Sequence, residues 1–371
     1  MCGIGAIIGF DQSDRLTKAK ALEKSLSVRG PDASGIYESE SNDCSLVHTR
    51  LAIIDLDDRS NQPMKRDDII VSFNGEIYNF REIKNNLLKL GVVFSTESDT
   101  EVICFVYKHY GVAGLEQLRG MYSILLLDET EKVLYALRDE HGIKPLYYYT
   151  DDGNLIFSST VRAFSKLLDS VTLCERGLSD FHAFGYILEP NTIFKEMKCV
   201  GTGSILIVNL VTKELREFDI REHSNIEKKI TCFSDNDSLS SILDETISAH
   251  LISDCPVNFF LSAGLDSTIL VDRARSMIKR SQVHSLTLGF EEFRGSENDE
   301  TVWAQVNASE MRVQNKQIFL NENDTDALIE KYFLSMDQPT LDGFNTFLIS
   351  YLASINEFKV SISGLGADEF F

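Results

Sequence analysis

The pattern of apolar residues changes near residue 236, and this change constrains the fold more than any other feature of the chain. Before about residue 205, short apolar runs follow one another with turn signals between them, such as Asp151-Asp152-Gly153-Asn154. From about residue 236, apolar runs of strand length alternate with amphipathic stretches of helix length. The first pattern predicts an α+β domain with stacked antiparallel sheets, and the second predicts an α/β domain with a doubly wound parallel sheet.

The chain has 371 residues, which is too long for a single typical core, so we expect two domains. We place them at 1–205 and 236–371, and we interpret the charged, aperiodic residues 206–235 as a linker. In the first domain we expect strands over 69–73, 122–127 and 145–149, and helices over 15–28, 79–90 and 99–110. In the second we expect strands over 257–261, 283–290, 313–320 and 360–362, and helices over 236–252, 267–280, 297–311, 324–335 and 344–356.

Composition excludes several classes of function. The chain carries 57 acidic and 36 basic residues, a formal net charge of −21, and such a surface repels nucleic-acid phosphates. We find neither a signal peptide nor an apolar run long enough to span a membrane, and the cytoplasm is the expected location. The seven cysteines are scattered without a CxxC pair, which argues against a disulfide framework and against zinc.

Cys2 directly follows the initiator Met1 and opens a glycine-rich apolar run. If Met1 is removed, Cys2 carries a thiol and a free α-amine on one carbon. These groups titrate near ~8.5 and ~8, so the amine can act as base for the thiol without a separate histidine. A buried structural cysteine in a strand is the plainer interpretation.

Further polar residues in the first domain fit amide hydrolysis. Asn74 and the adjacent Gly75 can supply two donors to an oxyanion, and Arg50 can bind a carboxylate in bidentate fashion. Glu76 and Asp99 offer carboxylates to an ammonium group. Taken singly, each has a structural explanation: a hairpin turn at Asn74-Gly75, a surface ion pair at Arg50, and a helix cap at Asp99.

In the second domain, the run FLSAGLDST (260–268) follows an expected strand and opens an expected helix. Small residues at a helix N-terminus let backbone N–H groups face an anion, and Ser262, Ser267 and Thr268 add hydroxyl donors. Asp266 cannot bind bare phosphate and is best interpreted as a Mg²⁺ ligand. The alternative is an ordinary strand-to-helix turn with Asp-Ser capping.

Taken together, the motifs of the first domain resemble a known family. CGI (2–4), RGPD (29–32), HTRLAIIDL (48–56), FNGEIYN (73–79) and ESDTE (97–101) occur in the order found in the class II glutamine amidotransferase domain of asparagine synthetases. The resemblance covers nearly all of 1–205 and implies an N-terminal-nucleophile fold with Cys2 as nucleophile. It implies that glutamine is bound by Arg50, Asn74, Gly75, Glu76 and Asp99, with Asn74 and Gly75 also holding the oxyanion. One departure is Thr160, where the family usually has an acidic residue.

The second domain resembles the ATP-pyrophosphatase-type synthetase domain of the same family. Residues 262–267 are similar to its SGGLDS loop, with Ala263 in place of one glycine, and 363–369 are similar to its SGEGSDE loop. The resemblance implies cofactors ATP and Mg²⁺, with Asp266 and Asp368 as metal ligands. The residues it implies for ATP binding are Leu261, Ser262, Gly264, Asp266, Ser267, Thr268, Leu288, Ser363 and Gly364. In such enzymes ATP adenylates a carboxylate, and ammonia from glutamine then displaces AMP.

Two departures leave the acceptor open. Leu365 stands where the family has a glutamate tied to aspartyl-adenylate formation, and the chain ends at Phe371 inside the motif, so we expect an incomplete domain and a fragment. Aspartate is the default acceptor, which places the chain in asparagine biosynthesis, and a sugar uronic acid is the alternative. A truncated chain with only glutaminase and nucleotide-binding function, or a plain glutamine hydrolase, also fits. Family members are often homodimers.

Overall fold

The computed structural model describes residues 1–371 except 42, 221–238, 279–282 and 367–371. The chain divides into two compact units. The first consists of Met1–Lys228 together with Asp337–Thr340, and the second consists of Lys229–Met336 and Leu341–Phe371. No described helix is long and apolar enough to cross a membrane.

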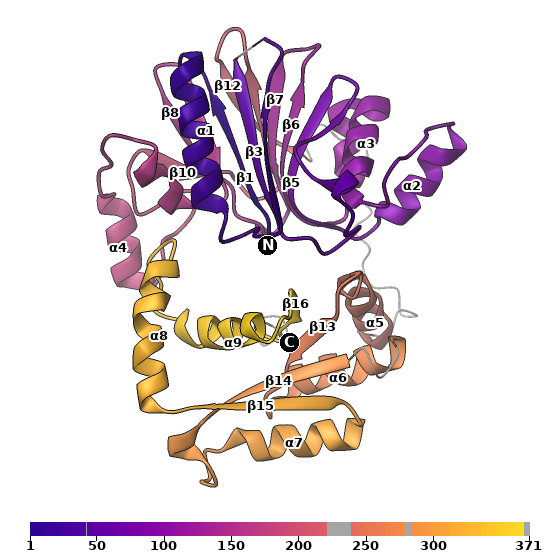
Figure 1. Cartoon of the computed structure of the whole chain (residues 1–371), viewed down its shortest axis with the longest axis vertical. Coiled ribbons are helices and arrows are strands. Elements are labelled where there is room, and N and C mark those ends of the chain that lie inside the picture. Colours follow the sequence, from indigo (N-terminus) through magenta and orange to yellow (C-terminus); the bar gives the residue numbers. More distant parts are fainter. Residues whose placement is uncertain (42, 221–238, 279–282, 367–371) are drawn as a thin grey trace. The chain divides into compact units, whose positions relative to one another are not determined.

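The first unit is built on two six-stranded sheets, and every pair of neighbouring strands is antiparallel (Figure 1). In spatial order the first sheet contains β10 (Met197–Cys199), β8 (Tyr147–Asp151), β9 (Asn154–Ser158), β1 (Gly3–Ile8), β3 (Cys44–Arg50) and β2 (Ala33–Glu38). The second contains β12 (Leu215–Asp219), β11 (Ser204–Asn209), β7 (Val133–Arg138), β6 (Gly120–Asp128), β5 (Ile69–Ile77) and β4 (Met64–Arg66). The predicted α+β class with stacked antiparallel sheets is confirmed.

The two sheets share a core because successive side chains of a strand point to opposite faces. On β1, Ile4 and Ile8 pack between the sheets with Leu125 of β6, and all three are fully buried. Ile7 points the other way, into a second apolar cluster that it shares with Leu22 of α1 (Gln12–Leu26). Helix α1 therefore covers the outer face of the first sheet (Figure 1).

On the other side of the unit, α3 (Asp99–Gly114) packs against β5, and α2 (Phe80–Lys89) packs against α3. A further helix, α4 (Glu175–Phe184), follows the short 3₁₀ helix η3 (Val161–Lys166). Helices α2 and α3 agree with the expected helices over 79–90 and 99–110. The structure thus places helices outside both sheets, around a core between them.

The second unit contains a four-stranded parallel sheet in the order β15 (Gln314–Leu320), β14 (Val283–Phe290), β13 (Val257–Phe260) and β16 (Val360–Ile362). One face packs on α5 (Leu239–His250), α6 (Leu265–Met277) and α7 (Glu300–Met311). The other face packs on α8 (Glu322–Ser335) and α9 (Phe344–Ile355). Helices on both faces confirm the doubly wound arrangement that the alternating sequence predicted.

The expected linker is wrong over residues 206–219. These residues include most of β11 and all of β12, which extend the second sheet of the first unit. The charged residues that suggested a linker, such as Lys213, Glu214 and Arg216, lie in the tight turn between these strands and on β12, which is an edge strand. Charge is common on edge strands because it blocks pairing with other chains. Residues 221–235 of the expected linker lie outside the described residues.

Asp337 contributes to the first unit from a distant part of the sequence. Its carboxylate accepts hydrogen bonds from the backbone N–H groups of Val161 (2.9 Å) and Arg162 (2.8 Å), the first residues of η3. The N-cap residue of η3, Thr160, makes no capping hydrogen bond with its own side chain. Asp337 therefore supplies the acceptor that a capping side chain normally provides.

We predict that Asp337→Ala destabilises the first unit, because two N–H groups at the start of η3 lose their acceptor. Loss of a helix cap costs about 1 kcal/mol, within a range of roughly 0.5–2 kcal/mol. Asp169→Ala, an exposed carboxylate near the end of η3, is the matched control and should change the free energy of unfolding by less than about 0.5 kcal/mol. Urea denaturation of both variants tests this, and equal stabilities would contradict it.

Candidate active site

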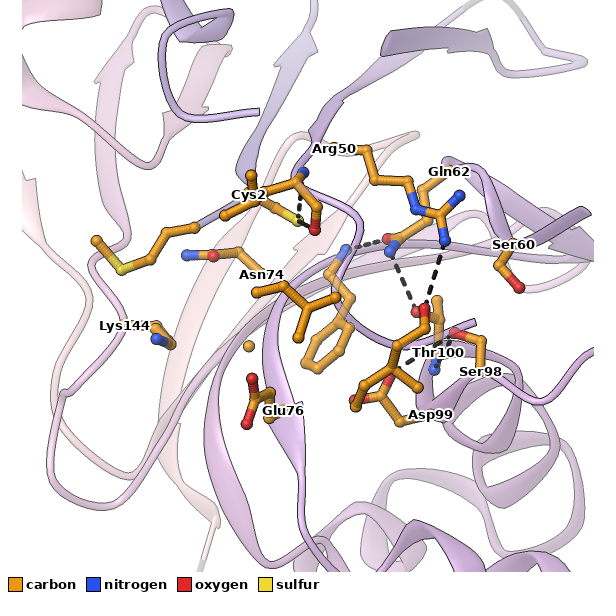
Figure 2. A pocket seen from close by; sticks show the side chains of 16 residues that line it. Cys2, Arg50, Ser60, Gln62, Asn74, Glu76, Ser98, Asp99, Thr100 and Lys144 are labelled. Atoms are coloured by element: carbon orange, nitrogen blue, oxygen red, sulfur yellow. Dashed lines mark hydrogen bonds between the residues drawn. The ribbon is translucent and has the colours of Figure 1, made fainter. Parts of the chain in front are cut away.

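The six residues predicted to act on glutamine line a single pocket in the first unit (Figure 2). They come from four places in the fold: the start of β1, the end of β3, strand β5, and the first turn of α3. The residues are Cys2, Arg50, Asn74, Gly75, Glu76 and Asp99. The fold therefore brings together side chains that lie nearly a hundred positions apart in the sequence.

Cys2 is held by contacts on its side chain and its backbone. The thiol lies 3.7 Å from the carbonyl oxygen of Leu51 and accepts a 3.4 Å hydrogen bond from the Leu51 N–H. The Cys2 carbonyl accepts a 2.9 Å bond from Nε of Arg29. Burial raises the pKa of the Cys2 thiol and lowers the pKa of the neighbouring Met1 α-amine to about 6. In this environment the amine accepts a proton less readily, and the thiol gives up its proton less readily.

The RGPD turn explains why the chain is so tightly organised beside Cys2. Arg29 anchors the Cys2 carbonyl, and Asp32 accepts a 2.8 Å hydrogen bond from the Ala52 N–H just after β3. A Cβ on Gly30 would lie 2.2 Å from the backbone of Thr49, so only glycine fits there. Arg29 and Asp32 thus position the pocket, a role that sequence analysis did not assign although it noted the motif.

Arg50 is fixed almost entirely by neutral acceptors. Its Nη1 donates to the Asp57 carbonyl (3.0 Å) and to the Asn61 side chain (2.8 Å), and its Nη2 donates to the carbonyls of Ile54 and Asp55. These bonds set the guanidinium plane without neutralising its charge. Arg50 is therefore a preorganised cation in the pocket and not the surface ion pair considered from sequence.

Asn74 and Gly75 lie inside β5, where they pair with β6, so the hairpin-turn interpretation is wrong. A Cβ on Gly75 would lie 2.1 Å from the carbonyl oxygen of Met121, which explains the glycine by close strand packing. Asn74 is buried, and its Nδ2 lies 3.5 Å from Oγ of Ser123. This bond is long, and the amide also faces the pocket (Figure 2).

Glu76 and Asp99 are two buried carboxylates in the same pocket. Burial and the nearby charge of Asp99 raise the pKa of Glu76 to about 7. Burial raises the pKa of Asp99 to about 6, although its Oδ2 accepts a 3.1 Å bond from the Ile77 N–H. The helix-cap interpretation of Asp99 is wrong, because Ser98 is the N-cap of α3 and bonds the Thr100 N–H.

Sequence analysis missed several polar residues that line the pocket. Gln62 connects β5 to α3: its Oε1 accepts from the Phe73 N–H (2.7 Å), and its Nε2 donates to Oγ1 of Thr100 (3.1 Å). Lys144 also lines the pocket and is only 8% exposed. Lys144 lies in the stretch RDEHGIKPLYY (138–148), and nothing in the residue types of that stretch pointed to the pocket.

The predicted nucleotide residues gather at the carboxyl edge of the parallel sheet. Ser262 and Ser267 hydroxyls lie 3.0 Å apart, and the Ser262 Oγ accepts from the Gly264 N–H (3.1 Å). Leu261 follows β13, and its N–H bonds the Leu286 carbonyl, two residues before Leu288 on β14. The loop thus leads directly into α6, with Asp266 in its first turn.

The second loop predicted to bind nucleotide follows β16 and meets the first. A Cβ on Gly364 would lie 3.0 Å from both the Asp266 Cβ and the Ser267 backbone nitrogen, so the two loops are in contact. Ser363 accepts from the Leu365 N–H at 3.2 Å, and the Leu365 side chain is exposed. Asp368, the second predicted Mg²⁺ ligand, lies outside the described residues.

Comparison with known proteins identifies both units. Residues 1–219 match a family described as glutamine amidotransferase domain, and residues 238–371 match one described as asparagine synthase. The whole chain aligns with a putative glutamine-hydrolysing asparagine synthetase from Methanocaldococcus jannaschii at 31% identity, and the alignment covers 75% of that protein. The chain belongs to the glutamine-hydrolysing asparagine synthetase family.

Other relatives in this family differ in length and in name. The chain aligns with asparagine synthetase 1 from Bacillus subtilis at 28% identity, over 58% of that protein's length. It aligns with a protein named amidase chry2 from Gibberella zeae at 29% identity, over 59% of that protein's length. The present chain thus spans less than two thirds of these two relatives.

We predict that Glu76→Gln stabilises the first unit at pH 8 and has little effect near pH 4.5. The pKa of Glu76 is about 7 when folded against 4.5 for a free glutamate, so the folded state holds its proton over this range. Stability from this group is therefore lost as pH rises from about 4.5 to about 7. Removing the charge should recover about 1–3 kcal/mol above pH 7. Thermal melts at both pH values test this, and a destabilised variant at pH 8 would contradict it.

Proposed function

We propose that this chain is a glutamine-dependent amidotransferase that hydrolyses glutamine at Cys2 and delivers the ammonia to an ATP-adenylated carboxylate. The observation that carries the proposal is the convergence of Cys2, Arg50, Asn74, Glu76 and Asp99 in one pocket. A thiol, a fixed cation, an amide donor and two carboxylates together match the groups of a glutamine molecule. The products are an amide, glutamate, AMP and pyrophosphate.

In the proposed glutaminase reaction, removal of Met1 exposes the α-amine of Cys2, which takes the thiol proton. The sulfur attacks the carboxamide carbon of glutamine, and the resulting oxyanion is stabilised by the Asn74 amide and the Gly75 N–H. The C–N bond then breaks, and ammonia leaves with the proton from the amine. Water hydrolyses the thioester to glutamate and regenerates the thiol.

The same pocket would orient the substrate at its other end. The Arg50 guanidinium would bind the α-carboxylate of glutamine, because its hydrogen bonds to neutral acceptors leave its charge uncompensated. Glu76 and Asp99 would receive the α-ammonium. Fixing both ends of the amino acid places the carboxamide at the sulfur, and such positioning lowers the entropic part of the barrier.

In the second unit, the loop 261–268 and the start of α6 would bind the phosphates of ATP. Its small residues and the hydroxyls of Ser262, Ser267 and Thr268 supply donors, and the N-terminus of α6 favours an anion. Leu288, Ser363 and Gly364 would complete the nucleotide site. These assignments are supported by the contact between the two loops at Gly364.

The oxygen donors of this loop fit Mg²⁺, which prefers carboxylates together with phosphate oxygens and water. Asp266 would hold the ion from the first turn of α6, with Asp368 as the second ligand. Among the described residues, which do not include Asp368, no group of three His, Cys, Asp or Glu side chains is arranged to hold a metal. When bound, Mg²⁺ neutralises charge on the leaving pyrophosphate.

Aspartate is the proposed acceptor, and a sugar uronic acid is the second candidate. Leu365 favours the second, because a leucine can neither transfer a proton nor pair with a cation where the family has a glutamate. A homodimer in the cytoplasm is the proposed state.

We predict that Cys2→Ala abolishes glutamate formation from glutamine but retains any synthesis driven by added ammonium chloride. The substitution removes the attacking sulfur and leaves the second unit unchanged. Cys174→Ser, a matched change at a half-buried cysteine outside the pocket, should retain glutamine turnover. Glutamate formation by the Cys2→Ala protein would overturn the assignment of the nucleophile.

The acceptor is tested by pyrophosphate release from the protein. With ATP, Mg²⁺ and glutamine present, we expect release that requires aspartate. Release that instead requires a uronic acid would establish the second candidate. Glutamate formation without acceptor-dependent release would overturn the synthetase part of the proposal and leave a glutaminase.

A further inference from the structure

Lys144 is a nearly buried cation in the glutamine pocket to which neither sequence analysis nor family membership assigns a role. It lies in the loop between β7 and β8, and its side chain is only 8% exposed. It lines the same pocket as Cys2 and Glu76 (Figure 2). A buried cation is costly unless a counter-charge or ligand compensates it.

The backbone of Lys144 is fixed on both sides of its Cα atom. Its N–H donates to Oδ2 of Asp139 (3.0 Å), and its carbonyl accepts from Nε of Arg138 (3.1 Å). Asp139 also accepts from the N–H groups of Tyr122 (3.1 Å) and Ile143 (2.9 Å). These bonds hold the loop so that the lysine side chain starts from a defined position.

The ammonium of Lys144 makes no hydrogen bond or ion pair within the described parts of the chain. The carboxylate of Glu76 also makes no hydrogen bond or ion pair within the described parts of the chain. Glu76 is 9% exposed and lines the same pocket as Lys144. Opposite charges thus face one pocket without touching. Such a pair is suited to a polar ligand that enters between or beside them.

The groups that face Lys144 are Glu76, Asp139, Cys2 and Arg29; the first three favour its charged form, and Arg29 opposes it. Four backbone N–H groups already compensate Asp139. Glu76 is therefore the carboxylate left to interact with Lys144. Glu76 in turn faces Asp99, Lys144 and the N-terminal amine, and Asp99 is the group that opposes its ionisation.

We propose that Lys144 is a positioning residue of the glutamine site, whose ammonium keeps the Glu76 carboxylate ionised for the α-ammonium of the substrate. The inference rests on the proposed hydrolysis of glutamine at Cys2. Without Lys144, the charge of Asp99 would still oppose ionisation of Glu76, and only the N-terminal amine would remain of the two cations that favour it. Glu76 would then stay protonated to a higher pH, and over that range the substrate ammonium would lose one of its two partners.

Loss of Lys144 should weaken glutamine binding by an amount that depends on pH. The pKa of Glu76 is about 7, and removal of a neighbouring cation raises it further. Glutamine binding should therefore weaken most below pH 7 and least at higher pH, where Glu76 is ionised with or without the lysine. A rise of about one pKa unit corresponds to about tenfold weaker binding at low pH.

The test measures glutamine binding without turnover. Titration calorimetry with L-glutamine on the full chain carrying Cys2→Ala, from about pH 6 to pH 8.5, gives the reference affinities. Adding Lys144→Met should weaken binding about tenfold at pH 6 and less than about threefold at pH 8.5. Lys144→Arg, which keeps the charge, should follow the reference, and Lys144→Gln provides a second neutral variant if Lys144→Met does not fold.

A second comparison separates an electrostatic role from a structural one. With Glu76→Gln already present, Lys144→Met should add no pH-dependent loss, because the group through which the lysine acts is gone. Equal weakening by Lys144→Met at every pH, or tighter binding, would overturn the inference while the proposed function stands. Failure of the Cys2→Ala reference to bind glutamine would instead overturn the proposed function.

Discussion

Strand β1 lies in the middle of the first sheet, and its pairing on both sides fixes the place of Cys2. It pairs with β3 along one edge and with β9 along the other. Chain termini usually fray, but here the third residue already belongs to a fully buried strand. Arg29 then holds the Cys2 carbonyl, and Leu51 contacts the thiol. A reactive group at the end of the chain thus gains the rigidity of a sheet interior.

The pocket next to Cys2 collects more charge than a buried site normally tolerates. Arg50 and Lys144 bring cations, and Glu76 and Asp99 bring carboxylates, all at least nine-tenths buried. Their hydrogen bonds go mostly to backbone groups, so the charges remain available. An amino acid carries one charge of each sign beside its side chain, and such a site can receive both. The raised pKa values of Glu76 and Asp99 reflect the free-energy cost of burying these two carboxylates in the pocket.

Sequence patterns predicted the element types well because apolar periodicity directly reflects burial. The strand over 283–290 and the helix over 344–356 match β14 and α9 almost residue for residue. The errors came where long-range contacts decide the outcome. Gly75 looked like a turn residue because its clash with the Met121 carbonyl depends on strand pairing 46 positions away. Lys144 reaches the pocket only because Asp139 and Arg138 hold its loop.

The capping of η3 by Asp337 limits how modular this chain is. A segment between α8 and α9 belongs structurally to the unit that contains Cys2, although the residues around it belong to the other unit. One cut near residue 220 would leave the N-terminal piece without the carboxylate that satisfies Val161 and Arg162. The two halves of the gene are therefore not interchangeable parts: exchanging the second half for that of another protein would also change a structural component of the first.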